Sequence, residues 1–263
     1  MMSTRAELKG RAKDCLRRYF WSALFVSVLQ MLLMGTLSSA PVNANAVSSA
    51  VVSGQSVASQ LEGGDLAYMM MVLPVVVMGI LLSMAIGVGY SVFVGNVIYV
   101  GSCRYFMESR AYGEDRGIGK LFYGFRRGSY LNTVFTMFMM NLYVFLWSLL
   151  LFVPGVIKSY EYRMVPYILA ENPNMNYRDV LALSRKMTDG HKMELFILEL
   201  SFFGWAFLGT LLCGIGIIFV QPYMNTTFAE VYAELREQSG EAGRSLPGFG
   251  DGPEDYYTSY TMQ

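Results

Sequence analysis

The fold of this chain is decided by LAYMMMVLPVVVMGILLSMAIGVGYSVFVGNVIYVGSC, the stretch Leu66–Cys103, which contains no charged residue. Three further runs share this property, namely Tyr19–Leu61, Gly128–Ile157 and Leu200–Ala229, and together the four make up more than half of the chain. The hydrocarbon core of a bilayer is about 30 Å thick, and about 20 apolar residues of helix cross it. Each run can hold at least one crossing, so the sequence predicts a multi-pass membrane protein.

The composition agrees with a single membrane domain. Of the 263 residues, 54% are hydrophobic and only 15% are charged, and the mean hydropathy is +0.36. Such a chain is too apolar for an ordinary soluble domain. We expect a membrane domain over residues 1–237. Residues 238–263 are Gly, Ser, Pro, Tyr and acidic residues with almost no aliphatic side chains, which is typical of a disordered tail.

Lysine and arginine are distributed unevenly around the apolar runs. They cluster before Tyr19, in Arg104–Arg127, in Arg178–Lys192 and in the tail, whereas Ser38–Leu66 has none. Cytoplasmic segments of membrane proteins carry an excess of basic residues. The charge pattern therefore predicts that both termini are cytoplasmic and that Ser38–Leu66 lies outside.

The N-terminus allows a second interpretation. A basic start, an apolar stretch and Ala44-Asn45-Ala46 resemble a cleavable signal peptide with a small-residue cleavage site. However, the apolar stretch Tyr19–Leu37 is too long for a typical signal peptide. We therefore favour an uncleaved first crossing.

Turn signals divide the four runs into six helices. Gly128–Ile157 would be about 45 Å long as one helix, so we expect it to fold back at Pro154-Gly155, and we expect Leu200–Ala229 to fold back at Cys213–Gly216. The fourth helix is costly because it carries Lys158, Glu161 and Arg163; a charge at the centre of a membrane helix costs about 2.5–3.5 kcal/mol. The expected helices are 19–37, 67–100, 129–153, 156–170, 191–212 and 217–235.

A short amphipathic segment precedes the first, third and fifth helices. Thr4 and Glu7 are spaced as a capping box at the start of the first segment. Such segments lie in the headgroup interface with the apolar face toward the lipid. We therefore predict an all-α membrane bundle of three hairpin units, about 1–103, 104–173 and 174–237, each preceded by an interfacial helix. The three apolar faces are Leu8, Ala12, Cys15 and Tyr19; Ile118, Leu121, Phe122 and Phe125; and Val180, Leu183, Ser184 and Met187.

Several motifs carry a family resemblance: Arg5-Ala6-Glu7-Leu8-Lys9 with Trp21, Pro154-Gly155-Val156-Ile157-Lys158-Ser159-Tyr160, Ala170-Glu171-Asn172-Pro173, Gly204-Trp205, Gly214-Ile215-Gly216 and Pro222-Tyr223. Together they resemble the bacterial membrane family called domain of unknown function 975, from residue 1 to about 237. The resemblance implies a multi-pass protein of the bacterial cell membrane and no agreed activity. Met193 and Arg18 depart from the family pattern, where an aromatic residue and glycine are usual.

Polar and ionisable residues within the apolar runs form a candidate intramembrane polar site. Such residues mark functional positions in membrane proteins, although a structural ion pair between hairpins is an equally good interpretation here. We expect Arg163 to pair with Glu199 first and with Glu230 second, because a lone guanidinium at that depth is costly. The polar centre of the sixth helix fits either a substrate pathway or interhelical hydrogen bonding. The candidate residues are Glu161, Arg163, Glu199, Gln221, Asn225 and Glu230.

Small residues recur every four positions through the second helix, at Gly79, Ser83, Gly87, Ser91 and Gly95. This spacing lets another helix approach closely. The stripe predicts a helix contact, within one chain or between copies in a homo-oligomer.

The sequence contains no motif for catalysis, nucleotide binding or nucleic-acid binding, and the three cysteines and single His191 have no metal-site spacing. We therefore expect a non-enzymatic protein without a cofactor or metal. A transport or substrate-passage protein is the first hypothesis. The alternative is a structural or regulatory membrane module that binds partner proteins or anionic lipids through its basic interfacial helices.

Overall fold

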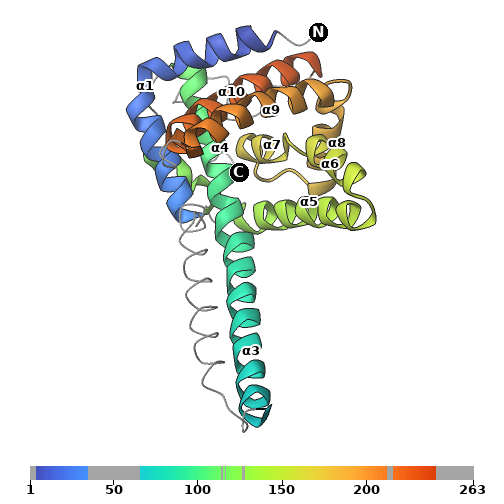
Figure 1. Cartoon of the computed structure of the whole chain (residues 1–263). Coiled ribbons are helices and arrows are strands. Elements are labelled where there is room, and N and C mark those ends of the chain that lie inside the picture. Colours follow the sequence, from blue (N-terminus) through green and yellow to red (C-terminus); the bar gives the residue numbers. More distant parts are fainter. Residues whose placement is uncertain are drawn as a thin grey trace. The chain divides into compact units, whose positions relative to one another are not determined.

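The structure is a computed structural model that describes residues 4–34, 66–113, 115, 117–125, 128–211 and 216–240. Every regular element in these residues is a helix, which confirms the predicted all-α class. In chain order (Figure 1) they are α1 (Arg5–Leu33), α3 (Leu66–Tyr90), the π-helix η1 (Ser91–Gly95), α4 (Asn96–Tyr112), the 3₁₀-helix η2 (Ile118–Phe125), α5 (Tyr130–Leu150), α6 (Phe152–Glu161), α7 (Val165–Glu171), α8 (Tyr177–Thr188), α9 (Lys192–Leu211) and α10 (Gly216–Gln238).

The chain divides into two compact units. Unit 2 is Met31–Gly95 and holds α3 and η1, and unit 1 comprises Met1–Gln30 and Asn96–Gln263. In unit 2 the hydroxyl of Tyr90 donates a hydrogen bond to the carbonyl of Leu33 at 2.5 Å. Residues 38–65 of the expected outer loop, 213–215 of the expected turn Cys213–Gly216, and 241–263 of the tail lie outside the described residues.

Helix α1 is bent at Tyr19, whose backbone angles (φ −131°, ψ 29°) are not helical. The bend separates the basic part of the helix from its apolar part, where the sequence predicts this boundary. The predicted capping box is present, because Glu7 Oε2 accepts from the Thr4 amide at 3.1 Å and Thr4 Oγ1 accepts from the Glu7 amide at 3.4 Å. Leu8 and Ala12 are fully buried, so the protein itself covers the apolar face that we expected to face lipid.

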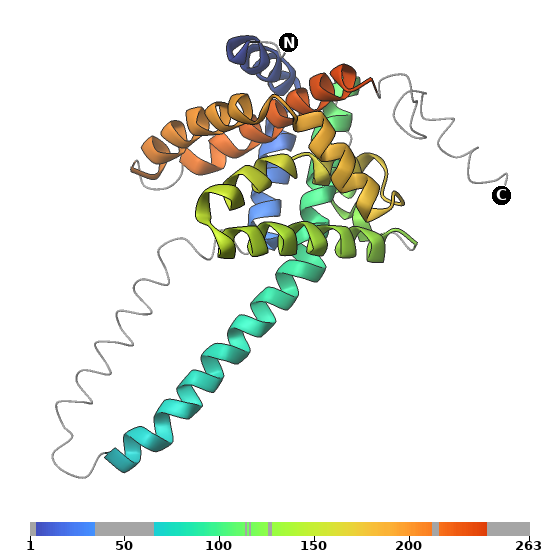
Figure 2. The same cartoon turned by 90° about the vertical axis from the view of Figure 1, so that its right-hand side faces the viewer.

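Helix α4 forms the core of unit 1. Its residues from Val100 to Ser109 are all buried, and it packs on η2, α7 and α10. The approach of η2 requires Gly101, because a Cβ there would overlap the backbone carbonyl of Leu121. Helices α9 and α10 lie side by side in both views (Figures 1 and 2) and pack on each other.

The expected fourth helix, 156–170, is wrong as a single helix. The chain turns at Leu151, where the backbone is extended, and α6 begins at Phe152. Pro154 therefore lies in the first turn of α6, where its missing N–H needs no partner. Residues 162–164 form a turn before α7. At 1.5 Å per residue α6 and α7 are about 15 and 10 Å long, so neither alone crosses a bilayer core.

The other two amphipathic segments are also helical. In η2, Leu121 is buried while Ile118, Phe122 and Phe125 are exposed. In α8 the apolar face is covered by the protein, because Val180 and Met187 are buried.

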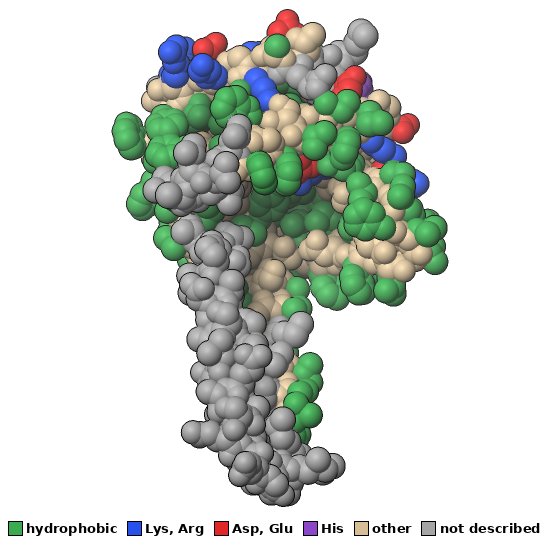
Figure 3. Space-filling model, viewed as in Figure 1, with side chains coloured by type: hydrophobic (Ala, Val, Ile, Leu, Met, Phe, Trp, Pro, Cys, Tyr) green, Lys and Arg blue, Asp and Glu red, His purple; other side chains and the backbone are tan. Residues whose placement is uncertain are grey.

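Two helical stretches of the described residues are long and apolar enough to cross a membrane, namely Val77–Tyr112 and Tyr130–Leu150. Large apolar side chains are also exposed on unit 1, among them Trp21, Phe145, Leu149, Phe203 and Phe207. Figure 3 shows hydrophobic side chains over α5 and the later part of α1, and charged ones toward the N-terminal half of α1 and near α8. This separation of apolar and charged surface is typical of a protein in contact with lipid.

Candidate functional site

The predicted pair between Arg163 and Glu199 is present. Arg163 Nη2 lies 2.8 Å from Glu199 Oε1, and the Tyr160 hydroxyl donates to Glu199 Oε2 at 2.8 Å. The Arg163 guanidinium also lies over the Phe228 ring, 4.6 Å from its centroid. The side chains of Arg163 and Glu199 are 28% and 34% exposed. Arg163 thus links the turn before α7 to α9 and α10 at a partly open position.

Glu230 is not part of that cluster. Its buried carboxylate binds Arg110 Nε at 2.8 Å, and the Cys15 thiol lies 3.8 Å from the same oxygen. The alternative pairing of Arg163 with Glu230 is therefore absent. Asn225 is buried, and its Nδ2 has no hydrogen-bond partner among the described residues. Gln221 is half-buried.

Glu161 belongs to a third cluster. Its buried carboxylate lies 2.5 Å from Lys158 Nζ, 2.6 Å from Lys192 Nζ and 3.7 Å from Arg185 Nε. The hydroxyls of Ser184 and Thr188 donate to its backbone carbonyl at 2.8 and 3.3 Å. Glu161 thus fixes α8 and α9 to the turn after α6, while Arg163, two residues on, binds elsewhere.

Two glycines of the small-residue stripe have open space beside them in the described part of the chain. A Cβ added at Gly79 or Gly87 would meet no atom within 4 Å, and only Gly95 is buried. The predicted helix contact stays a prediction.

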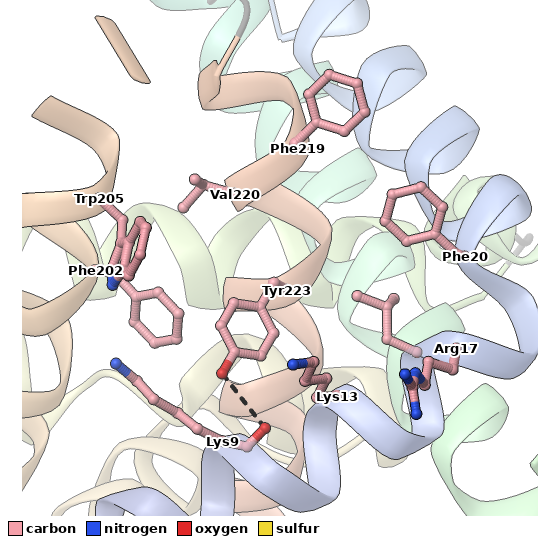
Figure 4. A pocket seen from close by; sticks show the side chains of 10 residues that line it. Lys9, Lys13, Arg17, Phe20, Phe202, Trp205, Phe219, Val220 and Tyr223 are labelled. Carbon is pink, nitrogen blue, oxygen red and sulfur yellow. Dashed lines mark hydrogen bonds between the residues drawn. The ribbon is translucent and has the colours of Figure 1, made fainter. Parts of the chain in front are cut away.

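A concave feature with a distinctive chemistry lies between α1, α9 and α10 (Figure 4). We call it the α1 groove, and its cavity volume is about 700 Å³. Sequence-distant segments form it, with α1 on one side and the α9–α10 pair on the other. Its lining residues are Lys9, Lys13, Leu16, Arg17, Phe20, Phe202, Trp205, Phe219, Val220 and Tyr223.

One end of the α1 groove is basic. Lys9, Lys13 and Arg17 repeat every four residues and so follow one face of α1. Acidic residues are absent from the lining that the structure describes. Glu7 and Asp14 are about 160° and 140° around the helix from Lys9. Asp14 is only about 60° from Arg17, but it is not among the described lining residues.

Lys9 connects α1 to α9 and α10, which form the opposite side of the groove. Its ammonium donates a hydrogen bond to the Ser201 hydroxyl and lies 4.4 Å from the centroid of the Phe202 ring. The Tyr223 hydroxyl donates to the Lys9 carbonyl at 3.3 Å, as Figure 4 shows. The contacts of Lys9 thus hold the basic part of α1 against both α9 and α10.

The other end of the α1 groove is aromatic, and the rings of Phe20 and Phe219 stack there with centroids 6.5 Å apart. Phe202 meets Tyr223 edge to face at 5.3 Å beside Lys9, so aromatic rings also reach the basic end. Trp205 is 64% exposed and Phe219 49% exposed. The groove therefore offers cations at one end and a half-open apolar wall at the other.

The sequence reasoning did not identify this groove. The spacing of Lys9, Lys13 and Arg17 was a visible signal, but the same pattern is expected for any interfacial helix with a solvated basic face. The contact between Lys9 and Ser201 joins residues 192 apart in the chain, and no local pattern predicts such a contact. As for metals, the described residues contain no group of three His, Cys, Asp or Glu side chains that could hold an ion.

Comparison with known proteins gives one family. Residues 132–239 match the family model described as "Protein of unknown function (DUF975)", which confirms the family resemblance over these residues; the resemblance of residues 1–131 stays a prediction. The match covers most of α5 and all of α6 to α10, and it leaves out α1. No curated protein and no solved structure matches the chain.

Proposed function

We propose that this chain, whose residues 132–239 match the DUF975 family model, is a multi-pass membrane protein that binds an anionic amphiphile in the α1 groove. The protein acts as a non-enzymatic binding module of the membrane. The observation that carries the proposal is the groove itself, with three cations at one end and aromatic side chains at the other.

The exposed surface of unit 1 supports a place in the membrane. Apolar side chains such as Phe25, Leu131 and Leu200 are exposed and would be costly in water. With the basic segments on the cytoplasmic side, both termini are cytoplasmic and Ser38–Leu66 is outside. In this proposal the protein belongs to the bacterial cell membrane and crosses it about six times, with α6 and α7 together completing the fourth crossing.

The bend of α1 at Tyr19 sets the level of the groove in the membrane. Before the bend the helix is basic, and after it the helix is apolar. The first part lies at the headgroup interface, where amphipathic helices with Lys and Arg bind anionic lipids. A groove that begins at Lys13 and Arg17 and ends at Phe219 follows the same change from headgroup to hydrocarbon.

The substrate-passage function expected from the sequence depends on Arg163, Glu199 and Gln221. None of the three lines the α1 groove, so the two functions use different residues. The passage function stays a prediction, and the groove supports the binding module.

The test is lipid retention after purification in a mild detergent, measured by native mass spectrometry. We expect the wild-type protein to retain an anionic phospholipid and the double variant Lys13→Ala, Arg17→Ala to lose most of it. The matched control is Arg178→Ala, Lys186→Ala, which removes the same charge from α8 and should retain the lipid. Equal retention by both double variants would contradict a groove site.

A further inference from the structure

We infer that the occupant of the α1 groove is a lipid whose headgroup is a phosphate monoester, namely phosphatidate. This inference rests on the proposed function and names the ligand class of the same site. It follows from the number of cations, from their spacing, and from the apolar surface beside them.

Lys13 and Arg17 give the basic end of the groove two positive charges, which is more than a phosphodiester lipid neutralises. Both line the groove, and the described lining contains no carboxylate. A phosphodiester headgroup carries one negative charge, whereas a phosphate monoester carries about −1.5 to −2 at pH 7 because its second pKa is about 6. The monoester is therefore the better electrostatic match for the two charges of Lys13 and Arg17.

The spacing of these cations fits a compact group with three oxygens. Lys13 and Arg17 are one helical turn apart, with Cβ atoms about 5–6 Å from each other. An arginine fork binds phosphate through two parallel hydrogen bonds, and lysine adds a point charge. Lys9 is anchored on Ser201 and Phe202 and closes the same end. A terminal phosphate can receive hydrogen bonds from Lys13 and Arg17 at once.

The wall beside the basic end fits acyl chains better than a soluble phosphate. Phe20 and Phe219 extend it away from Arg17, and Trp205 is largely exposed on it. Burial of apolar surface gives binding energy that a free phosphate or a small phosphate ester cannot use. The source of the phosphate is accordingly a membrane lipid.

The fluorescence of Trp205 reports directly on the occupant of the groove. The chain has three tryptophans, and the other two, Trp21 and Trp147, are replaced by phenylalanine so that Trp205 alone gives the signal. The protein is reconstituted in phosphatidylcholine vesicles that contain brominated phosphatidate, brominated phosphatidylglycerol or brominated phosphatidylcholine. Bromine quenches a tryptophan that it contacts. We expect half-maximal quenching at about tenfold less phosphatidate than phosphatidylglycerol at pH 7.5, since one additional charge-assisted hydrogen bond corresponds to about a factor of ten.

Two changes test the headgroup assignment. Lowering the pH from 7.5 to 5 removes the second charge of the monoester, so the preference for phosphatidate should shrink while phosphatidylglycerol stays constant. Arg17→Lys keeps the charge and loses the fork, so it should reduce the preference, whereas Lys13→Ala, Arg17→Ala should abolish it. Arg178→Ala, Lys186→Ala is the control, and circular dichroism checks the helix content of each variant.

The outcomes separate the two proposals. Equal quenching by phosphatidate and phosphatidylglycerol, both above phosphatidylcholine, would overturn the monoester and leave the anionic groove intact. Equal quenching by all three lipids would overturn both. Competition by glycerol 3-phosphate at the same concentration would overturn the lipid as the source of the phosphate.

Discussion

Removal of either partner of the Arg163–Glu199 pair should destabilise the protein, and the two losses should be coupled. Arg163→Ala removes a charged hydrogen bond at 2.8 Å, worth about 1.5–3 kcal/mol, and a contact with the Phe228 ring, worth about 0.5–2 kcal/mol. Because each side chain is about a third exposed, solvent screens the pair. We therefore expect a loss of about 2–3 kcal/mol in the free energy of unfolding.

Glu199→Ala removes the same pair together with the hydrogen bond from Tyr160, so it should cost about 2–3 kcal/mol as well. The double variant should lose about 1–2 kcal/mol less than the sum, which is the coupling energy that a double-mutant cycle reports. Unfolding by SDS in mixed micelles, followed by circular dichroism, measures each value. Arg178→Ala is the control for arginine removal and should change stability by less than about 0.5 kcal/mol. Strictly additive losses would refute the pair as an energetic link between the turn before α7 and α9.

Three further outcomes are expected. Gly101→Ala should destabilise the protein by about 1–3 kcal/mol or more, because its Cβ would overlap the Leu121 carbonyl. A Cβ at Gly119 meets no atom within 4 Å, so Gly119→Ala should be nearly neutral in the same unfolding assay. Burial and then the neighbouring Glu230 carboxylate raise the pKa of Cys15 above 9.0. In a variant without the other cysteines, alkylation of Cys15 should therefore reach half its maximal rate above pH 9. Glu230→Gln should lower the pH of this midpoint. Burial alone would raise the pKa of Asp115, but hydrogen bonds from Ser22, the Gly117 amide and Tyr105 lower it below 3.8. The stability difference between wild type and Asp115→Asn should therefore be constant around neutral pH and should vanish as the pH falls below 3.8. Thermal unfolding at a series of pH values measures this difference.

Features set by composition or by an unavoidable electrostatic cost could be predicted from the sequence. The expected crossings within the charge-free runs were predicted as helices, since only internal hydrogen bonds satisfy the backbone in lipid, and the described parts of these runs are helical apart from turns. The boundary at Tyr19 followed from the change from basic to apolar residues, and Glu199 from the need of Arg163 for a carboxylate at its depth.

Features set by tertiary contacts could not be predicted in this way. Pro154 signals a break, but a proline fits equally well into the first turn of a new helix, and the structure has α6 there. The turn after Glu161 depends on hydroxyls of Ser184 and Thr188, which lie on a later helix. The α1 groove likewise depends on α9 and α10 packing beside α1, and the spacing of Lys9, Lys13 and Arg17 alone does not predict what faces them.

The measurement that tests the membrane arrangement most directly is the sidedness of single cysteines. Lys13→Cys, Lys120→Cys and Asp179→Cys, each in a variant without native cysteines, place one thiol in each of three basic segments that are separated by proposed crossings. A membrane-impermeant maleimide should label none of the three in intact cells and all three in inside-out vesicles. Labelling of any one of them in intact cells would contradict a multi-pass protein that keeps its basic segments, and the basic end of the α1 groove, on the cytoplasmic side.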